Sequence, residues 1–288
     1  MSERFWLLKK IKIHPLFWLV AAIAAVTARF QDLILLFAII FIHEMGHAVA
    51  AQYFSWRVKK IAILPFGGVA ETEEHGNRPL KEELIVTLSG PLQHVWIAVF
   101  AYLLFRFDVL PGQMYTQIGE WNRAILFFNL LPIWPLDGGK LLNMAFSTVY
   151  PFLRAFRMTI CCSFIALFLF HAAALLNAPA NLNVWAIAVY LYAALWKEWK
   201  QLYFVFIRFL LERYYGKRDP LRHLETIEVD AGAYLYEVLE SFKRGRKHPL
   251  IVLKNGVEVG KLDENELLHA FFSEKQTNAK VSDILYSY

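Results

Sequence analysis

The sequence predicts an α-helical membrane protein that crosses the bilayer about six times and ends in a small α/β domain. Two observations lead to this fold class. Hydrophobic residues make up 57% of the 288 residues and charged residues only 19%, whereas an ordinary soluble domain is about 45–50% apolar. The apolar residues form blocks up to residue 197, and the composition becomes that of a soluble domain from about residue 219. A disordered chain is excluded, because it would combine low hydrophobicity with high charge.

The apolar blocks are long enough to cross a bilayer core, which takes roughly 20 residues of helix. Lys and Arg gather in the N-terminal segment, in the loop after the second block and between the fourth and fifth blocks. By the positive-inside rule, six spans then place both termini in the cytosol. We expect the spans at about 13–30, 32–54, 84–105, 122–147, 158–177 and 181–197.

The net charge of +5 fits the same topology. Basic residues that orient the spans and meet anionic lipid headgroups account for it, so direct binding of nucleic acid is not expected. The two cysteines, Cys161 and Cys162, are adjacent within an apolar stretch. They cannot form a disulfide framework, which excludes a secreted disulfide-rich scaffold.

Two segments follow the transmembrane unit of residues 1–197. Residues 198–218 are aromatic and basic, which fits either an interfacial helix or a cytosolic continuation of the sixth helix that acts as a linker. Residues 219–288 predict the α/β domain, with a helix, two strands joined by a turn, and a helix cap. These are expected at 234–243, at 250–253 and 257–262, and at a capping box formed by Asp263 and Glu266.

The second apolar block carries the sequence His43-Glu44-Met45-Gly46-His47. Residues four apart lie on one face of a helix, so His43 and His47 can direct imidazole nitrogens at one Zn²⁺. Glu44 is adjacent and can reach a metal-bound water as general base and later as proton donor. Because ionisable groups are costly within an apolar span, we interpret this set as functional rather than as two packed histidines.

A catalytic zinc usually keeps three protein ligands and one open position, so a third ligand is needed. Asp137 is the best candidate. Pro135 and the two glycines after Asp137 predict a broken helix, which membrane depth tolerates only where it is buried or beside water. A polar turn at the membrane surface is the alternative for Asp137. Glu120 and Asp108 are rival ligands in loop-like surroundings.

Two other segments could contact a substrate. Asn129 could donate to a developing oxyanion or to the substrate backbone, or it could bond to a neighbouring helix. The apolar loop at Phe66, Gly67 and Gly68 could dip into the membrane and offer a strand edge to an extended substrate, or it could form a surface turn. Four more histidines lack ligand spacing and are interpreted as structural: His14, His75, His94 and His171.

Together, the motifs resemble the catalytic signature of the site-2 protease family of intramembrane zinc metalloproteases. Both halves occur in apolar sequence and in the family's order, as His43-Glu44-x-x-His47 and as Asn129 followed by Pro135-Leu136-Asp137-Gly138. Further stretches look like the sporulation branch of this family. They are residues 64–68, 73–83, 89–94 and 208–217.

The resemblance implies a mechanism in which zinc-bound water attacks a peptide bond. The substrate would be a membrane-associated pro-protein, the pro-sequence of a sporulation sigma factor (pro-sigma-K), and inhibitory membrane proteins would restrain the enzyme. The chain would lie in the bacterial membrane that surrounds the forespore, with the active site facing the mother cell. The implied roles are one Zn²⁺ per chain held by His43, His47 and Asp137, acid/base catalysis by Glu44, and shaping of the site by Asn129 and Pro135.

Residues 219–288 resemble a single cystathionine-β-synthase-type (CBS) domain. Such domains often bind adenine nucleotides and usually work in pairs. The resemblance therefore implies a site for ATP or another adenine nucleotide within 219–288. It also implies a homo-oligomer formed through these domains.

Two other functions fit parts of the sequence. A zinc transporter with a CBS-type regulatory domain would also carry His and Asp within its spans, but it does not need a glutamate between the two histidines. A non-catalytic membrane scaffold would keep the motif by descent, and the intact Glu44 argues against it.

Overall fold

The computed structural model describes residues 11–13, 30–56, 58–64, 67–72, 77–177, 182–216 and 223–285. The chain forms two compact units. The first unit comprises residues up to 74 together with 81–141 and 165–192, and the second comprises 75–80, 142–164 and 193–288. The expected division into 1–197, 198–218 and 219–288 stays a prediction.

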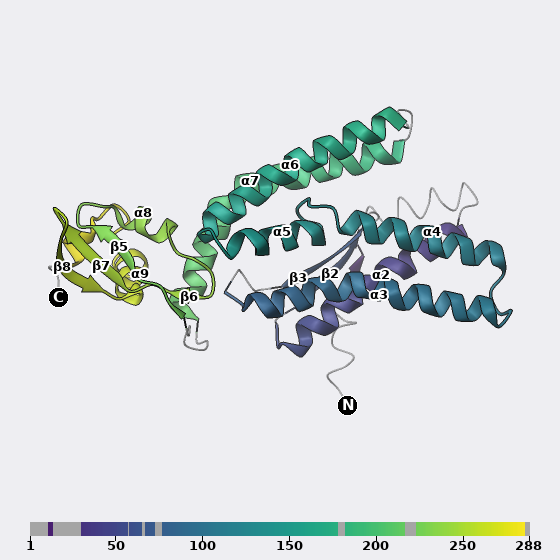
Figure 1. The fold of residues 1–288 in the computed structure, drawn as a ribbon, viewed down its shortest axis with the longest axis horizontal. Coiled ribbons are helices and arrows are strands. Elements are labelled where there is room, and N and C mark those ends of the chain that lie inside the picture. Colours follow the sequence, from purple (N-terminus) through teal and green to yellow (C-terminus); the bar gives the residue numbers. More distant parts are fainter. Residues whose placement is uncertain are drawn as a thin grey trace. The chain divides into compact units, whose positions relative to one another are not determined.

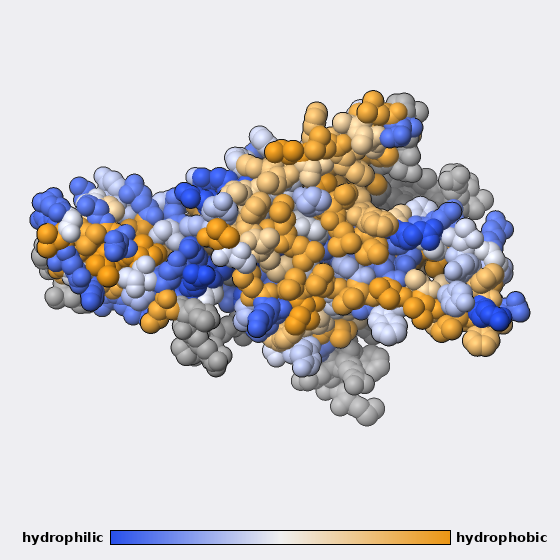
Figure 2. All heavy atoms as spheres, in the orientation of Figure 1, coloured by the Kyte–Doolittle hydropathy of each residue, from blue (hydrophilic) through white to orange (hydrophobic). Residues whose placement is uncertain are grey.

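Long helices carry the apolar blocks (Figure 1). Three of them are long and apolar enough to cross a membrane within the described part of the chain: Gln31–Tyr53, Leu80–Arg106 and Phe152–Asn177. Large apolar side chains such as Trp96, Phe100 and Phe168 are exposed on these helices, and Figure 2 shows hydrophobic residues over the helical region. Such a surface suits contact with lipid. The helices are α2 (Phe30–Tyr53), α3 (Leu80–Arg106), α4 (Gly112–Asn129), α5 (Asp137–Ser147), α6 (Phe152–Asn177) and α7 (Leu182–Tyr215).

The second, third and fifth expected spans correspond to the three candidate membrane helices. The first, 13–30, lies almost wholly outside the described residues. The expected span at 122–147 is divided between α4 and α5, with a non-helical connection at 130–136. The sixth is part of α7, which runs without a break to Tyr215. Whether residues 198–218 lie along the membrane or act as a cytosolic linker stays a prediction. A total of six spans remains a prediction.

A small sheet accompanies the first helices. Its strand order is β1 (Ile11–Ile13), β2 (Val58–Leu64) and β3 (Gly67–Thr72). β2 and β3 form an antiparallel hairpin in which Leu64 is paired with Gly67, and both strands contact α2. Among the described residues, β3 is paired on one side only. Gly67 and Gly68 therefore begin an edge strand, whereas Phe66 lies outside the described residues.

The C-terminal region has the predicted mixture of strands and short helices. Asn255 and Gly256 have φ angles of 53° and 79°, the left-handed pair that a two-residue hairpin of this sequence favours. Asp263 and Glu266 form the predicted capping box. Two short strands, β4 (His223–Leu224) and β6 (Arg246–Lys247), form a parallel pair. A second sheet has the order β5 (Ile227–Asp230), β7 (Leu250–Lys254) and β8 (Val257–Leu262). The helices of this region are α8 (Leu235–Glu240), α9 (Glu264–Phe272) and α10 (Val281–Leu285).

Candidate metal centre

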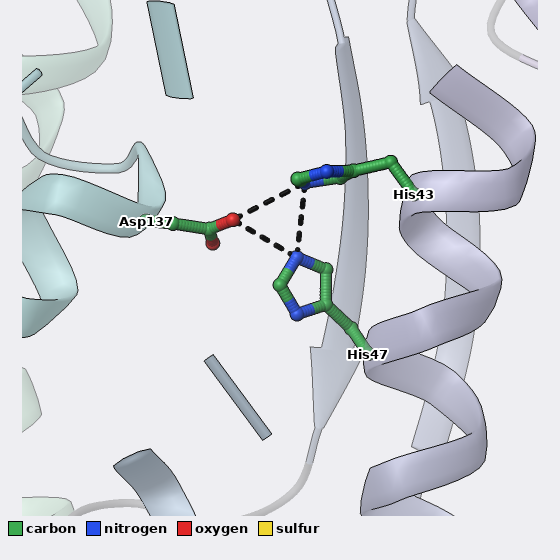
Figure 3. Close-up of side chains that lie close together, drawn as sticks. All are labelled: His43, His47 and Asp137. Atoms are coloured by element: carbon green, nitrogen blue, oxygen red, sulfur yellow. Dashed lines mark hydrogen bonds and ion pairs between the residues drawn. The ribbon is translucent and has the colours of Figure 1, made fainter. Parts of the chain in front are cut away.

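Three buried side chains from two helices meet at one point. His43 and His47 come from α2, and Asp137 is the first residue of α5. The Nε2 atoms of the histidines are 3.1 Å apart, and Oδ2 of Asp137 lies 3.2 Å from His43 Nε2 and 3.0 Å from His47 Nε2. Figure 3 shows the three side chains converging, with the carboxylate facing both imidazole rings. The structure thus brings together the three residues that the sequence predicted as ligands.

Helical spacing explains how α2 presents its part of the cluster. His43 and His47 are one turn apart, so their rings lie on the same face, with ring centroids 4.7 Å apart. Glu44, the residue after His43, is only 6% exposed and is therefore also withdrawn from solvent. A carboxylate and two imidazoles in the apolar helix α2 are costly to bury unless they are paired or bind a ligand.

A backbone contact fixes the orientation of His47. Its Nδ1 lies 2.7 Å from the carbonyl oxygen of Val86 on α3. Because a carbonyl can only accept, Nδ1 must carry the proton, and a neutral His47 then presents a bare Nε2 to the cluster. Two glycines permit this close packing: a Cβ on Gly90 would collide with the His47 ring, and one on Gly46 would lie 2.5 Å from the carbonyl oxygen of Ser89.

The break between α4 and α5 places Asp137. The connection folds back over the start of α5, where a Cβ on Gly138 would collide with the carbonyl oxygens of Leu130 and Leu131. The carboxylate stands in the first turn of α5, where the helix dipole favours a negative charge. Nζ of Lys140 donates to Oδ1 at 3.0 Å. The other oxygen, Oδ2, accepts no hydrogen bond from the described residues and faces the histidines.

The donor set fits a zinc ion. Two imidazole nitrogens and one carboxylate oxygen are common zinc ligands, and ligand atoms on a tetrahedral zinc with bonds of about 2.0–2.1 Å lie roughly 3.3 Å apart. The three separations of 3.0–3.2 Å are close to that spacing. Lone-pair atoms gathered this closely repel one another unless a cation or a proton lies between them. Residues His43, His47 and Asp137 could therefore hold a metal ion.

The other predicted site residues do not join this cluster. The side chain of Asn129, at the end of α4, donates to the carbonyl oxygen of Ile125 on its own helix at 3.0 Å. Pro135 lies in the connection before α5 and follows a cis peptide bond. The rival ligands Asp108 and Glu120 are both exposed and outside the cluster.

Sequence reasoning missed several residues that surround the cluster. His94, interpreted as structural, contacts His43, and Asn122 contacts His94. Lys140 and Gly90 orient ligands as described above. The signal that identified His43, an ionisable side chain in an apolar span, was equally present at His94. His171 has aromatic contacts with Trp185 and Tyr192 instead, and His14 and His75 lie outside the described residues.

Comparison with known proteins agrees with this geometry. Residues 31–120 match the model of peptidase family M50. The chain is 44% identical to stage IV sporulation protein FB of Bacillus subtilis over 288 residues, which is the full length of both. It is 33% identical to a zinc metalloprotease of Methanocaldococcus jannaschii over 125 residues, 42% of this chain and 36% of the relative. The solved site-2 protease from that organism superposes with a TM-score of 0.53 at 25% identity, covering 65% of this chain and 89% of the other.

Helices of membrane-spanning length, a buried His-His-Asp cluster and these relatives define a class, the intramembrane metalloproteases. The chain belongs to peptidase family M50, the site-2 protease family, and is a metalloendopeptidase. Of the functions that the sequence left open, family membership therefore favours the peptidase over the transporter and the scaffold.

Proposed function

We propose that the chain is a zinc protease that cleaves the pro-sequence of a membrane-associated sporulation sigma factor, pro-sigma-K. One observation carries the catalytic part of the proposal. His43, His47 and Asp137 direct three ligand atoms at a common point, with separations of 3.0–3.2 Å, from helices that also hold Glu44 and Lys140. The His-Glu-x-x-His spacing on one helix is an arrangement that places two zinc ligands and a general base in many zinc peptidases.

A zinc ion bound to these residues would supply Lewis-acid chemistry, polarising a peptide carbonyl and making water acidic enough to act as a nucleophile near neutral pH. With zinc bound, Glu44 would be the residue that accepts the proton of the attacking water and later returns it to the leaving amine. It lies one residue from His43 and is buried, so the proton is passed within a site withdrawn from bulk solvent. Lys140 holds Oδ1 of Asp137 and interacts electrostatically with Glu44.

The edge of β3 supports a way to present the substrate. A helix hides its carbonyl groups in hydrogen bonds, so the peptide must be extended where it is cut. β3, which begins with Gly67 and Gly68, contacts α2 and is paired on one side only among the described residues. We propose that an extended substrate adds to this edge. Phe66, Asn129 and Pro135 are proposed to shape the surrounding site.

The choice of substrate rests on likeness to a sporulation protein over the whole chain. A pro-sigma factor held at the cytosolic face of the membrane suits a protease whose site is buried among apolar helices. With this substrate, the enzyme would lie in the membrane around the forespore, facing the mother cell, with both termini in the cytosol. Inhibitory membrane proteins would then be its natural regulators.

The C-terminal region supports a regulatory role. From β5 to α9 the elements follow in the order strand, helix, three strands, helix, and the first of the three strands, β6, has two residues and pairs with β4 rather than with the β5-β7-β8 sheet. Without β6 the order is strand, helix, strand, strand, helix, which is compatible with the CBS-type domain proposed for residues 219–288. We propose that it binds ATP or another adenine nucleotide and pairs with the same domain of a second chain. Adding ATP to the purified full chain should then change the cleavage rate, and an unchanged rate would remove the nucleotide from this proposal.

The test is co-expression of the full chain with pro-sigma-K in a heterologous bacterium. Wild type should cleave the substrate. Glu44→Gln should retain zinc and lose about 10²–10⁴-fold in rate, because only the proton carrier is changed. Asp137→Asn should lose activity together with zinc. Glu120→Gln, which alters an exposed carboxylate outside the cluster, is the matched control and should behave as wild type. Undiminished cleavage by Glu44→Gln would contradict the assigned role.

A further inference from the structure

Two buried polar side chains outside the proposed ligand set form a continuous hydrogen-bonded chain with His43. Nδ1 of His43 lies 3.0 Å from Nε2 of His94 on α3, and Nδ1 of His94 lies 2.7 Å from Oδ1 of Asn122 on α4. The amide nitrogen of Asn122 donates to the backbone carbonyl of His94 at 2.9 Å. His94 is 1% exposed and Asn122 is 4% exposed, so water does not compete for these groups.

The direction of this chain follows from its last hydrogen bond. The carbonyl oxygen of His94 can only accept, so Asn122 must turn its NH₂ group toward it and its Oδ1 toward the His94 ring. Oδ1 in turn can only accept, so Nδ1 of His94 carries a proton. A neutral His94 then has a bare Nε2, which accepts from Nδ1 of His43. His43 is thereby left with a lone pair on Nε2, the atom that faces Asp137.

We propose that His94 and Asn122 are positioning residues that set the tautomer and ring orientation of His43 for metal binding. The inference rests on the proposed zinc site. The pair would hold the proton of His43 on Nδ1 and leave Nε2 free to bind metal, as the Val86 carbonyl does for His47. A metal-bound imidazole commonly donates its other N–H to such a partner, which raises its basicity and fixes its plane. His94 is not itself a ligand, because its Nε2 is engaged by His43.

A merely structural role for this pair would leave the affinity for metal unchanged in any variant that still folds. The variants are therefore chosen to separate shape from hydrogen bonding. His94→Phe keeps an aromatic ring without an acceptor, whereas His94→Gln places an amide near the position of Nε2. Asn122→Leu is close in shape but releases the His94 tautomer. Thr159→Val removes a different buried hydroxyl, whose Oγ1 lies 2.9 Å from the carbonyl oxygen of Ala155 and 3.2 Å from Oδ1 of Asn143, and serves as the control.

The experiment measures zinc affinity by competition with a chelator, and the visible spectrum after loading with Co²⁺, on the detergent-solubilised full chain. His94→Phe should bind zinc about 10–100-fold more weakly, the usual cost of losing an outer partner of a metal ligand, with an altered cobalt spectrum. Asn122→Leu should lower the zinc affinity and alter the cobalt spectrum in the same direction as His94→Phe, but to a smaller extent. His94→Gln should recover most of the affinity, and Thr159→Val should match wild type.

Wild-type affinity and spectrum in His94→Phe would overturn the inference, as would an equal loss of affinity in Thr159→Val. If His94→Phe does not fold, Asn122→Leu decides by the same criterion. Failure of the wild type to bind zinc is a distinct result. It would overturn the metal site itself, and the positioning role with it.

Discussion

Each compact unit contains a buried polar cluster, and the two clusters differ in whether they are complete. The first cluster brings together three lone-pair atoms, one each from His43, His47 and Asp137. No hydrogen-bond donor among the described residues lies between them. In the second unit, Arg213 meets Glu264, with Nε and Oε1 2.7 Å apart and both side chains almost fully buried. In the first cluster Lys140 pairs only with the outer oxygen Oδ1 of Asp137, so the three converging ligand atoms still have no cation between them. In the second cluster the cation, Arg213, contacts the carboxylate directly.

Hydrogen bonds also pair the other polar atoms of the Arg213 cluster, and Nη2 of Arg213 donates to the carbonyl oxygen of Arg246 and to Oε2 of Glu264. Nη1 of Arg213 donates to the carbonyl oxygen of Lys243 at 2.9 Å, and Oε2 of Glu264 accepts from the backbone N–H of His248 at 2.7 Å. The guanidinium also lies 5.4 Å from the ring centroid of Phe242. Burial raises the pKa of Glu264, and the Arg213 charge opposes this shift. These contacts join the end of α7 to the C-terminal sheet region.

The difference separates a structural role from a ligand-binding role. A buried polar cluster in which every charge is matched holds segments of the chain together. A cluster whose acceptors converge on one another is stable only when something positive is added. Substitutions in the first cluster should therefore change metal binding, and substitutions in the second should change stability without changing metal binding.

The largest effect is expected at Gly90. In Gly90→Ala the new methyl group would collide with the His47 ring, so α3 or the ligand must move and zinc and cleavage should both be lost. Gly112→Ala is the matched control, because its Cβ would meet only the Phe105 ring at 3.5 Å. Zinc content and proteolysis of the two variants provide the measurement. A Gly90→Ala protein that holds zinc as wild type does would show that this close approach does not constrain the ligand.

A smaller effect, confined to stability, is expected at Glu264. Glu264→Gln leaves Arg213 buried without its counter-charge, which typically costs about 3–5 kcal/mol. Hydrogen exchange of peptides from β7 and α9 in the full chain should accelerate, while zinc content stays at the wild-type value. The control is Glu258→Gln, which removes an exposed ion pair with Lys261 and should have little effect. Loss of zinc in Glu264→Gln would contradict the separation of the two roles.

The smallest effect is a pH dependence that arises from His248. Burial lowers the pKa of His248, and the Arg213 charge adds to this, while contacts with Glu225 oppose it. Below the ordinary value of 6.5 the unfolded chain therefore binds more protons than the folded one, and stability should fall as the pH decreases from there. Exchange of β7 amides, corrected for the intrinsic pH dependence, should show this slope in wild type. His248→Gln should flatten it, and an unchanged slope would assign the effect elsewhere.

Local patterns predicted much of this structure. The spacing of His43 and His47 fixes a shared helix face, and Pro135 with the glycines after Asp137 indicates the break that precedes α5. The Asn255-Gly256 turn and the Asp263 capping box are equally local, because each depends on backbone preferences of a few residues.

The parts that sequence reasoning missed depend on contacts between distant helices. His94 reaches His43 across 51 positions, and Asn122 reaches His94 across 28. Periodicity along one helix does not indicate which side chain of another helix it will meet. The role of Gly90 could not be predicted for the same reason. A side chain is excluded at this position only because α3 packs against the His47 ring. Pro135 and the glycines indicated a break within the expected span at 122–147. They did not show that α4 and α5 are separate helices joined by 130–136, because the sequence on both sides is apolar enough to resemble one block.

The central claim is that the first cluster is completed by one zinc ion. X-ray absorption at the zinc edge of the purified full chain tests it most directly. The account predicts one zinc per chain, with two imidazole nitrogens and a carboxylate oxygen at about 2.0–2.2 Å. A chain that cleaves its substrate without zinc, or a zinc spectrum lacking imidazole, would contradict it.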